Sequence, residues 1–428
     1  MENPIPLERS SEISPSFTEM FRVFGRIGIL SFGGPAAQIA LMHKELVDER
    51  DWLTEDRFLG ALSFCMLLPG PEAMQLATYS GWRLRGTAGG LLAGLLFVLP
   101  GAAIILALAL LYIQFGTLPL AQAAFVGIKA TVVLIVLQAL WKLARKTLTR
   151  PLNWALALIS FICIYTLGLP FPIIVALAGL IGYLTTTNTA PTTTPPALHS
   201  RRQTTSKTLK TITLWAALWI TPILLVALLD HSFYTTLSLF FSKLAVVTFG
   251  GAYAVLAYMT QTVVGDFGWL TTAQMIDALG LAETTPGPLI LVTEFVGLLA
   301  GHAQGGLPVM LLAGALTLWC TFVPCFLWIF AGAPYVEWLL AQPRLAGALK
   351  AISAAVVGVI LNLSIWFALH VFFGNVITTR FGALPVWSEV SGTALMLSVI
   401  AAALLFALRL GMIPTLGVMA ALSTAIAL

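Results

Sequence analysis

Charged residues are scarce in this sequence. Only 9% of the 428 residues are Asp, Glu, Lys or Arg, whereas 59% are hydrophobic, and the mean hydropathy is +0.94. A soluble domain carries roughly 25% charged residues. So few charges cannot cover a water-facing surface of this size, which excludes a soluble enzyme and a disordered chain. The composition therefore predicts a protein whose main solvent is lipid.

Cysteine and the usual ligand and nucleophile motifs are also scarce. The chain has four cysteines, none in a C-x-x-C pair, and five scattered histidines. These counts exclude a disulfide-stapled secreted domain and offer no metal-ligand spacing. No Walker loop, H-E-x-x-H or G-x-S-x-G is present, and the basic residues form no cluster of the kind that binds nucleic acid. We therefore expect no enzyme activity, cofactor, metal or nucleic-acid partner.

Apolar segments of near membrane-spanning length fill most of the chain. A transmembrane helix needs about 20 mostly apolar residues, and thirteen segments meet or approach that length. They lie near 20–42, 58–82, 86–113, 119–141, 151–168, 170–184, 212–229, 237–260, 275–299, 305–332, 344–371, 389–408 and 411–428. The sequence leaves open whether 58–82 and 275–299 cross the bilayer or re-enter on the same side.

Polar stretches divide the chain into domains. The first residues lack the apolar core of a signal peptide, and a Thr- and Pro-rich basic stretch in the middle cannot bury a core. The predicted domains are a cytoplasmic tail 1–18, a first membrane repeat 19–184, a cytoplasmic linker 185–210, an extra span 211–230 and a second membrane repeat 231–428.

The basic residues indicate an orientation. If the N-terminus is cytoplasmic and every segment crosses, sixteen Lys and Arg fall in cytoplasmic loops, and only Lys44, Arg50, Arg57 and Arg380 fall outside. Lys and Arg collect in cytoplasmic loops of membrane proteins. We therefore predict a multi-pass membrane protein with a cytoplasmic N-terminus.

An internal repeat predicts the architecture. Shifted by 217 positions, the chain matches itself without a gap over nearly fifty residues. The matches include Phe32-Gly33-Gly34 with Phe249-Gly250-Gly251, Trp52 with Trp269, and Pro69-Gly70-Pro71 with Pro286-Gly287-Pro288. Seven segments separate the starts of the two repeats, and because seven is odd the second repeat should be inverted. Inverted repeats with substrate at their interface are typical of secondary transporters, so we predict an all-α polytopic fold of two inverted repeats.

Each repeat contains two helix-breaking motifs within its apolar segments. Proline removes a backbone donor and glycine opens unusual backbone conformations, so the motifs predict helices broken at membrane depth. Pro35, Pro71 and Pro288 are predicted to begin half-helices, whose free N–H groups and positive dipole ends suit a tetrahedral oxyanion. A plain proline kink is the alternative interpretation.

These motifs supply the candidate site. The predicted substrate-binding residues are Arg26, Ser31, Gly33, Gly34, Gly70, Gln75, Lys243, Thr248, Gly250, Gly251 and Gly287. The predicted structural breaks are Pro35, Pro69, Pro71, Pro286 and Pro288.

A charged side chain inside a membrane is expected to have a structural or functional role, because placing it at mid-bilayer costs about 3 kcal/mol or more of free energy. Arg26 and Lys243 occupy equivalent repeat positions and could balance the charge of a dianion, or else extend to the headgroups. Glu72, Glu283 and Glu294 are candidates for proton coupling. A stabilising place at a helix start would equally explain Glu72.

At these motifs the chain resembles the chromate ion transporter family. The resemblance rests on FGRIGILSFGGPAAQIALMHKELV (24–47), LLPGPEAMQLATYSGWRLRG (67–86), FGGAYAVLAYM (249–259) and AETTPGPL (282–289). It covers both halves and is similar to the long, two-domain members. The resemblance implies a bacterial inner-membrane protein with opposed halves that exports chromate, confers chromate resistance and is linked to sulfate, its analogue. Glu294 departs from the neutral polar residue expected there.

The sequence therefore predicts a secondary transporter that exports chromate across the inner membrane. Chromate, sulfate as its mimic, the lipid bilayer and a second copy of the chain in a homodimer are the expected partners. A sulfate or oxyanion carrier or exchanger that handles chromate by mimicry is an alternative. An anion channel is another, because broken helices also build selectivity filters.

Overall fold

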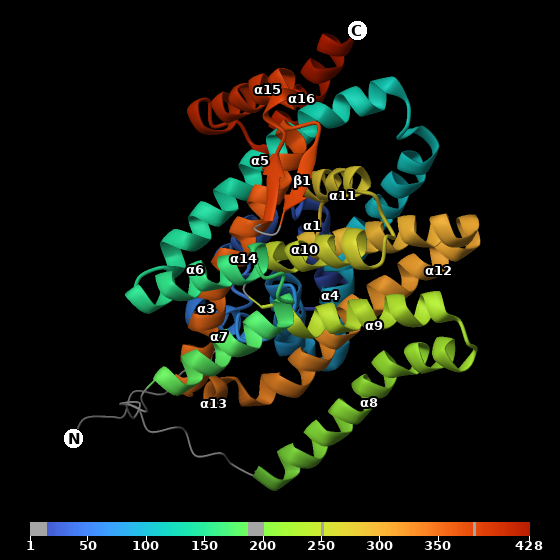
Figure 1. The fold of residues 1–428 in the computed structure, drawn as a ribbon. Helices are drawn as coiled ribbons and strands as arrows, with labels where there is room; N and C mark the ends of the chain where they lie inside the picture. The colour runs from blue at the N-terminus through green and yellow to red at the C-terminus, as the bar shows by residue number, and fades with distance from the viewer. Residues whose placement is uncertain (1–14, 187–200, 250–251, 380–381) are drawn as a thin grey trace, which may run out of the picture.

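The computed structural model describes residues 15–186, 201–249, 252–379 and 382–428. Most of the predicted tail and most of the predicted linker lie outside these residues, as do Gly250, Gly251 and Arg380. The described chain is almost entirely helical, as the composition predicts (Figure 1).

The first half contains seven α-helices and one π-helical segment. They are α1 (Phe17–Leu30), α2 (Gly34–His43), η1 (Lys44–Asp48), α3 (Glu55–Cys65), α4 (Glu72–Phe115), α5 (Pro119–Thr147), α6 (Pro151–Tyr165) and α7 (Phe171–Thr185). A further long helix, α8 (Arg201–Leu228), follows and lies at the periphery of the molecule (Figure 1).

The second half has a similar order of elements. They are α9 (Ser232–Val247), α10 (Ala252–Thr260), η2 (Gln261–Asp266), α11 (Thr272–Thr284), η3 (Leu289–Leu291), α12 (Val292–Gly332), η4 (Ala333–Tyr335), α13 (Val336–Leu340), α14 (Pro343–Phe372), β1 (Val376–Thr379), β2 (Gly382–Pro385), η5 (Trp387–Glu389), α15 (Gly392–Ala402), η6 (Ala403–Ala407) and α16 (Met412–Ala427).

One short β-ribbon interrupts the predicted all-α pattern. Strands β1 and β2 pair antiparallel, with Val376 opposite Pro385 and Thr379 opposite Gly382. The sequence Val-Ile-Thr-Thr is β-branched throughout, which favours an extended backbone over a helix. The fold is therefore nearly all-α.

The same shift of 217 relates the early elements of the two halves. Each of α1, α2, η1, α3 and α4 has a counterpart in α9, α10, η2, α11 and η3–α12, with bounds that agree within about two residues. The long helices also break alike, at Gly86 (φ 61°, ψ −156°) in α4 and at Gly306 (φ 73°, ψ −156°) in α12. The two break positions differ by 220 residues, not by the 217 of the repeat. The first arm of α12 is therefore slightly longer than the first arm of α4.

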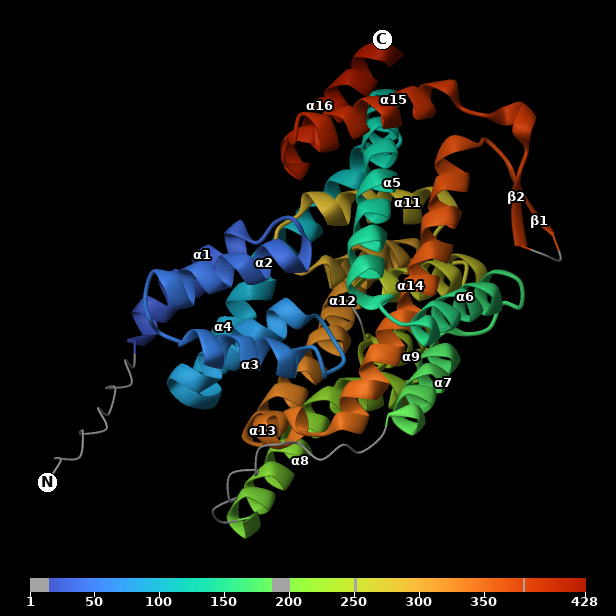
Figure 2. The ribbon, with the colours of Figure 1, turned by 90° about the vertical axis from the view of Figure 1, so that its left-hand side faces the viewer.

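The chain reverses direction at the Gly-Gly motifs. In the first half, Arg26 of α1 forms an ion pair with Glu45 of η1 at 3.4 Å. A continuous helix would place these residues about 28 Å apart, at 1.5 Å per residue. Figure 2 shows α1 and α2 side by side. The prediction that 20–42 is a single spanning segment is therefore wrong, and we name this pair of helices hairpin 1.

The segment 237–260 reverses in the same way. Lys243 of α9 lies over the ring of Tyr258 of α10, 5.5 Å from the ring centroid, and the ring of Phe240 lies 5.9 Å from that of Tyr258. The two helices therefore lie side by side, and we name them hairpin 3. A single crossing by 237–260 is also wrong.

The chain also reverses at the Pro-Gly-Pro motifs. The rings of Phe64 in α3 and Tyr79 in α4 lie 5.8 Å apart, although 15 residues separate them. We name α3 with the first arm of α4 (72–84) hairpin 2. In the second half, Tyr112 contacts both Asp277 of α11 and Phe295 of α12, so these elements also lie side by side. We name α11 with the first arm of α12 hairpin 4.

The last helices of each half pack against a helix of the other half. A side chain at Gly358 of α14 would collide with the backbone of Ala157 in α6, and one at Gly127 of α5 would collide with that of Met419 in α16. The hydroxyl of Ser423 in α16 also donates a hydrogen bond of 2.6 Å to the Ala123 carbonyl of α5. Each half therefore places its last two helices against a long helix of the other half (Figures 1 and 2).

Several helices are suited to a membrane. Within the described residues, five are long and apolar enough to span one: Glu72–Phe115, Pro119–Thr147, Ser206–Leu228, Leu289–Tyr335 and Pro343–Phe372. Five shorter apolar helices accompany them: Pro151–Tyr165, Phe171–Thr185, Ser232–Val247, Gly392–Ala407 and Met412–Ala427. The structure is thus that of a multi-pass membrane protein.

Candidate functional site

The four broken hairpins meet through two crossed hydrogen bonds. The Gly70 N–H of hairpin 2 donates to the Thr248 carbonyl of hairpin 3 at 2.8 Å, and the Gly287 N–H of hairpin 4 donates to the Ser31 carbonyl of hairpin 1, also at 2.8 Å. In the repeat, Ser31 corresponds to Thr248 and Gly70 to Gly287. A reciprocal contact of this kind is what a two-fold axis produces at an interface. The tips of all four hairpins are therefore brought to the boundary between the halves.

Glycine is required at both crossing points. Gly70 has φ 122° and Gly287 has φ 88°, in the region that other residues rarely adopt. A Cβ atom at Gly70 would lie 2.8 Å from the Gln75 side-chain nitrogen, and one at Gly287 would lie 2.9 Å from Leu291. Only glycine allows the backbones to approach in this way.

The two hydroxyl groups at the crossing are already committed as donors. The Ser31 hydroxyl donates to the Ile27 carbonyl and the Thr248 hydroxyl donates to the Leu244 carbonyl, each at 2.6 Å. Both residues are buried. Because each hydroxyl hydrogen is already used and the remaining lone pairs only accept, neither hydroxyl is a free donor for an anion, and backbone N–H groups are the better donors here.

Two buried glutamines brace the tips. The Gln38 amide of α2 donates to the Gly287 carbonyl at 2.6 Å and to the Ser31 carbonyl at 3.2 Å. The Gln75 amide of α4 donates to the Pro69 carbonyl at 2.7 Å. Each has a buried side-chain oxygen with no hydrogen-bond partner within the described part of the chain. Gln75 was predicted from the sequence, whereas Gln38 was not; the repeat gave no signal for either, since their counterparts are Val292 and Val255.

Helices begin at the tips. The α2 helix begins at Gly34, after Gly33 in the left-handed region and with Pro35 in its first turn. The α4 helix begins directly after Pro71, and the η3 turn begins directly after Pro288. None of these three starts has a side-chain cap in the described structure. The first N–H groups of α2 and α4 are therefore free to face a bound anion.

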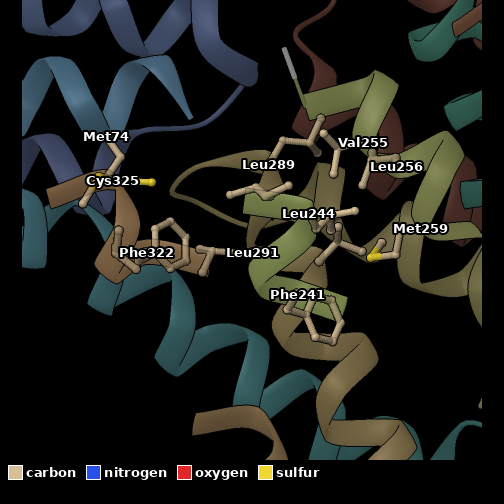
Figure 3. Close-up of a cluster of buried hydrophobic side chains, with 14 of the residues drawn as sticks. Met74, Phe241, Leu244, Val255, Leu256, Met259, Leu289, Leu291, Phe322 and Cys325 are labelled. Carbon is tan, nitrogen blue, oxygen red and sulfur yellow. The ribbon is translucent and has the colours of Figure 1, made fainter. Parts of the chain in front are cut away.

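Apolar side chains surround the second-half tip. Figure 3 shows Leu289 of η3 near Val255 of α10 and Leu244 of α9, and Leu291 of η3 beside Phe322 of α12. All five are buried, as are Pro286 and Pro288. A polar ligand held there would have little contact with water, so backbone donors would interact with it strongly.

The two predicted membrane cations lie away from the crossing. Arg26 has a side chain that is 56% exposed and pairs with Glu45. Lys243 is exposed and lies over Tyr258 of its own hairpin. Each cation therefore contacts a residue within its own hairpin. Their role in balancing substrate charge stays a prediction.

The three predicted carboxylates occupy different surroundings. Glu72 is half-buried at the first position of α4. Glu283 is buried at the end of α11 and accepts a hydrogen bond of 2.9 Å from the Tyr253 hydroxyl of α10. Glu294 is buried in the first turn of α12, and one of its oxygens has no hydrogen-bond partner among the described residues.

Another buried carboxylate, besides Glu45, was missed by the sequence reasoning. Asp277 of α11 is 1% exposed, lies 2.8 Å from the Lys129 ammonium of α5 and accepts a hydrogen bond of 2.7 Å from the Tyr112 hydroxyl of α4. Its counterpart in the first repeat is Gly60, so the repeat gave no signal. The only sequence signal for Asp277 was that an acidic residue lies within an apolar segment long enough to span a membrane. We name Asp277, Lys129 and Tyr112 the Asp277 cluster. Its contacts link hairpin 4 to the long helices α4 and α5 of the first half.

The chemistry of the described residues is that of binding. No group of three or more His, Cys, Asp or Glu within them could hold a metal ion. The starts of α2 and α4 beside the crossing offer backbone N–H groups without a side-chain cap. Such groups can hold a small anion and release it when the hairpins move.

Comparison with known proteins identifies relatives over nearly the whole chain. The family model described as "Chromate transporter" matches residues 18–183 and 235–426. The chromate transport protein of Pseudomonas aeruginosa is 33% identical over 352 residues, which cover 81% of this chain and 79% of that protein. The probable chromate transport protein of Synechococcus elongatus is 32% identical over 81% of this chain and 83% of its own length. The chromate transport protein of Cupriavidus metallidurans is 29% identical over 84% of this chain and 86% of its own. No solved structure matches.

Proposed function

The chain belongs to the chromate transporter family, and from this premise we propose that it exports chromate from the cytoplasm through a site where the four hairpin tips meet. The crossed hydrogen bonds of Gly70 and Gly287 carry this proposal. They join the two halves at the Gly-Gly and Pro-Gly-Pro motifs of the repeat, where the helices of each hairpin are broken. In secondary transporters, substrate sites lie at the interface of repeats and are built from discontinuous helices.

The two halves are proposed to be inverted repeats. Because each hairpin returns to the side from which it starts, the crossing elements are the second arm of α4, then α5, α6, α7 and α8, the second arm of α12, and α14, α15 and α16. This gives nine crossings instead of thirteen. Five of them lie between the starts of the two halves, and because five is odd the halves remain opposed. The reciprocal tip contacts support the same two-fold relation.

The distribution of basic residues supports this topology. Of the twenty Lys and Arg within the described residues, eighteen then lie in the first-half hairpins or in loops and helix ends on their side. They are Arg22, Arg26, Lys44, Arg50, Arg57, Arg83, Arg85, Lys142, Arg145, Lys146, Arg150, Arg201, Arg202, Lys207, Lys210, Arg344, Lys350 and Arg409. Lys129 lies within α5, and only Lys243 lies on the other side. Since basic residues collect in the cytoplasm, the N-terminal side is proposed to be cytoplasmic, in the inner membrane of a bacterium.

Outward transport of a dianion is electrically favourable. A cell interior is negative, and moving one elementary charge across a membrane is worth about 2.3 kcal/mol per 100 mV. Two negative charges that leave together therefore gain about 4.6 kcal/mol per 100 mV. Alternating access would expose the tip site first to the cytoplasm and then to the outside, as one half rocks against the other.

The carboxylates are proposed to link proton movement to this cycle. Glu72 is the leading candidate, because it is the first residue of α4 and directly follows the Pro69-Gly70-Pro71 tip. Glu283 is the second, because its Tyr253 hydrogen bond joins hairpins 3 and 4. If Glu72→Gln leaves the pH dependence of transport unchanged, Glu72 has no part in coupling.

Chromate uptake into everted vesicles tests the site. We expect Gly70→Ala to reduce uptake strongly, because its Cβ would crowd Gln75 and break the contact with Thr248. Gly268→Ala is the matched control, since Gly268 also has a positive φ (60°) but nothing lies within 4 Å of its added Cβ. Equal uptake by the two variants would refute a site at the tips. Sulfate added outside should compete if the site accepts any tetrahedral dianion.

A further inference from the structure

A cavity of about 430 Å³ lies apart from the hairpin tips. Its walls come from the end of α6, the α10–η2 boundary of hairpin 3, the start of α11, the last turns of α14 and the β-ribbon. The cavity therefore lies between the two halves, since α6 belongs to the first and the other walls to the second. None of Ser31, Gly70, Thr248 or Gly287 lines it.

The cavity lies at the end of the molecule away from the basic loops. The α6 helix begins next to Arg150 and ends at the cavity residue Tyr165, while α14 begins beside Arg344 and ends near the cavity residue His370. These helices run in the same direction, because Gly358 contacts Ala157 and, further along each helix, Trp366 and Tyr165 line the same cavity. Under the proposed orientation, the cavity opens to the outside.

The depth of the cavity brings it well into the bilayer. Asn362 is ten residues before the end of α14 at Phe372, which at 1.5 Å per residue is about 15 Å along the helix axis. The same cavity includes the surface β-ribbon residue Val376. The cavity therefore extends from the β-ribbon along the last turns of α14.

The lining mixes polar and apolar side chains. Its polar members include Tyr165, Thr260, Gln261, Thr272, Asn362 and His370, and among the described residues no Asp, Glu, Lys or Arg lines it. Thr260 is 4% exposed, and its buried hydroxyl has no hydrogen-bond partner within the described residues. An unpaired buried hydroxyl is costly, so a ligand or water is needed to satisfy it. A carboxylate would repel an anion, and a fixed cation would hold it too tightly to be released.

From this geometry we propose that the cavity is an exit vestibule that binds a tetrahedral oxyanion weakly, after it leaves the hairpin tips. The inference rests on the proposed function and adds a second site to it. Thr260, Gln261 and Asn362 supply neutral donors in the lining. The volume is many times the roughly 30 Å³ that one water occupies in the liquid, so the anion could keep part of its hydration shell. Weak binding at successive sites is what rapid release requires.

Thiol labelling in intact cells tests the vestibule. The variant Asn362→Cys is made in a Cys163→Ser background, because Cys163 is only partly buried and is adjacent to the lining residue Ile164. A membrane-impermeant thiol reagent is added outside, with and without sulfate. Sulfate is a tetrahedral dianion that does not oxidise thiols, as chromate would. We expect labelling from outside, with its rate falling to about half when sulfate equals its dissociation constant.

A matched control separates protection from a general salt effect. Asn375→Cys lies on the same side, beyond the end of α14 and outside the cavity lining. It should be labelled at a rate that sulfate does not change. Lack of labelling at position 362 in folded protein would overturn the proposal, because the cavity would then be closed to the outside.

Transport by Asn362→Leu supplies a second readout. We expect a lower maximal rate of chromate export at an unchanged half-saturating cytoplasmic concentration, because the first binding step at the tips is untouched. If sulfate gives no protection and Asn362→Leu exports chromate at the wild-type rate, the vestibule is refuted while the tip site stands. If the wild-type protein moves no chromate at all, the proposed function fails first.

Discussion

Replacing Lys129 with Met should destabilise the protein by about 3–5 kcal/mol, because it leaves a buried carboxylate without its counter-charge. Asp277 lies 2.8 Å from the Lys129 ammonium, and its side chain is 2% exposed. It cannot reach water from the interior position of α11. The Tyr112 hydroxyl would be its remaining partner, and one such charged hydrogen bond is worth only about 1.5–3 kcal/mol.

Removing the carboxylate instead of the ammonium should destabilise the protein less. Asp277→Asn leaves a cation whose side chain is 17% exposed and whose flexible stem can carry the ammonium toward water. The Asn amide also keeps an acceptor for Tyr112. The double variant Lys129→Met with Asp277→Asn removes both charges, so its cost should be well below the sum of the two single costs. We expect a coupling energy of about 1–3 kcal/mol, the range for residues in one network.

Denaturant unfolding of the purified protein in detergent measures these values. The wild type, both single variants and the double variant form one thermodynamic cycle, and Tyr112→Phe adds the contribution of the hydroxyl. Additive costs within about 0.5 kcal/mol would show that Lys129 and Asp277 do not form a pair. A larger cost for Asp277→Asn than for Lys129→Met would refute the reasoning from exposure.

Three further changes test other parts of the structure. Gly28→Ala should cost about 1–3 kcal/mol of stability, because its Cβ would collide with the α4 backbone, and thermal unfolding with Gly25→Ala as the open-space control checks this. The hydrogen bond with Glu55 raises the pKa of His43 above 6.5, so its stabilisation is fully present below pH 6.5 and is lost as pH rises through the folded-state pKa. The difference in melting temperature between wild type and His43→Gln should therefore shrink from pH 6 to pH 9, and a constant difference would contradict the assignment. Gly287→Ala, at φ 88°, should abolish chromate transport while remaining folded, and wild-type transport by this variant would argue against the crossing.

The positions of the helix breaks could be predicted from the sequence. Gly33, Gly34 and the two Pro-Gly-Pro motifs determine backbone conformation locally, so composition and the 217-residue repeat located all four breaks. The breaks observed at Gly33, Pro71 and Pro288 lie where these residues predict. Local chemistry was sufficient because only glycine and proline are tolerated in such turns.

The reversal of the chain at those breaks could not be predicted in the same way. A kinked helix that crosses and a hairpin that returns have the same apolar length, and only the tertiary contacts of Arg26 with Glu45 and of Phe64 with Tyr79 distinguish them. The Asp277 cluster also depends on the packing of helices far apart in sequence. Its partners, Lys129 and Tyr112, lie on two different long helices.

Chromate accumulation in everted vesicles tests the central proposal most directly. Vesicles that contain the folded protein are given an interior-positive membrane potential with no proton gradient, and labelled chromate is added outside. A dianion that moves without protons gains about 4.6 kcal/mol per 100 mV, a concentration ratio of about three powers of ten at equilibrium, and any proton exchanged for it adds to the charge moved. The account predicts accumulation that collapses with the potential and is lost in Gly70→Ala. No accumulation in the wild type, with or without a proton gradient, would contradict it.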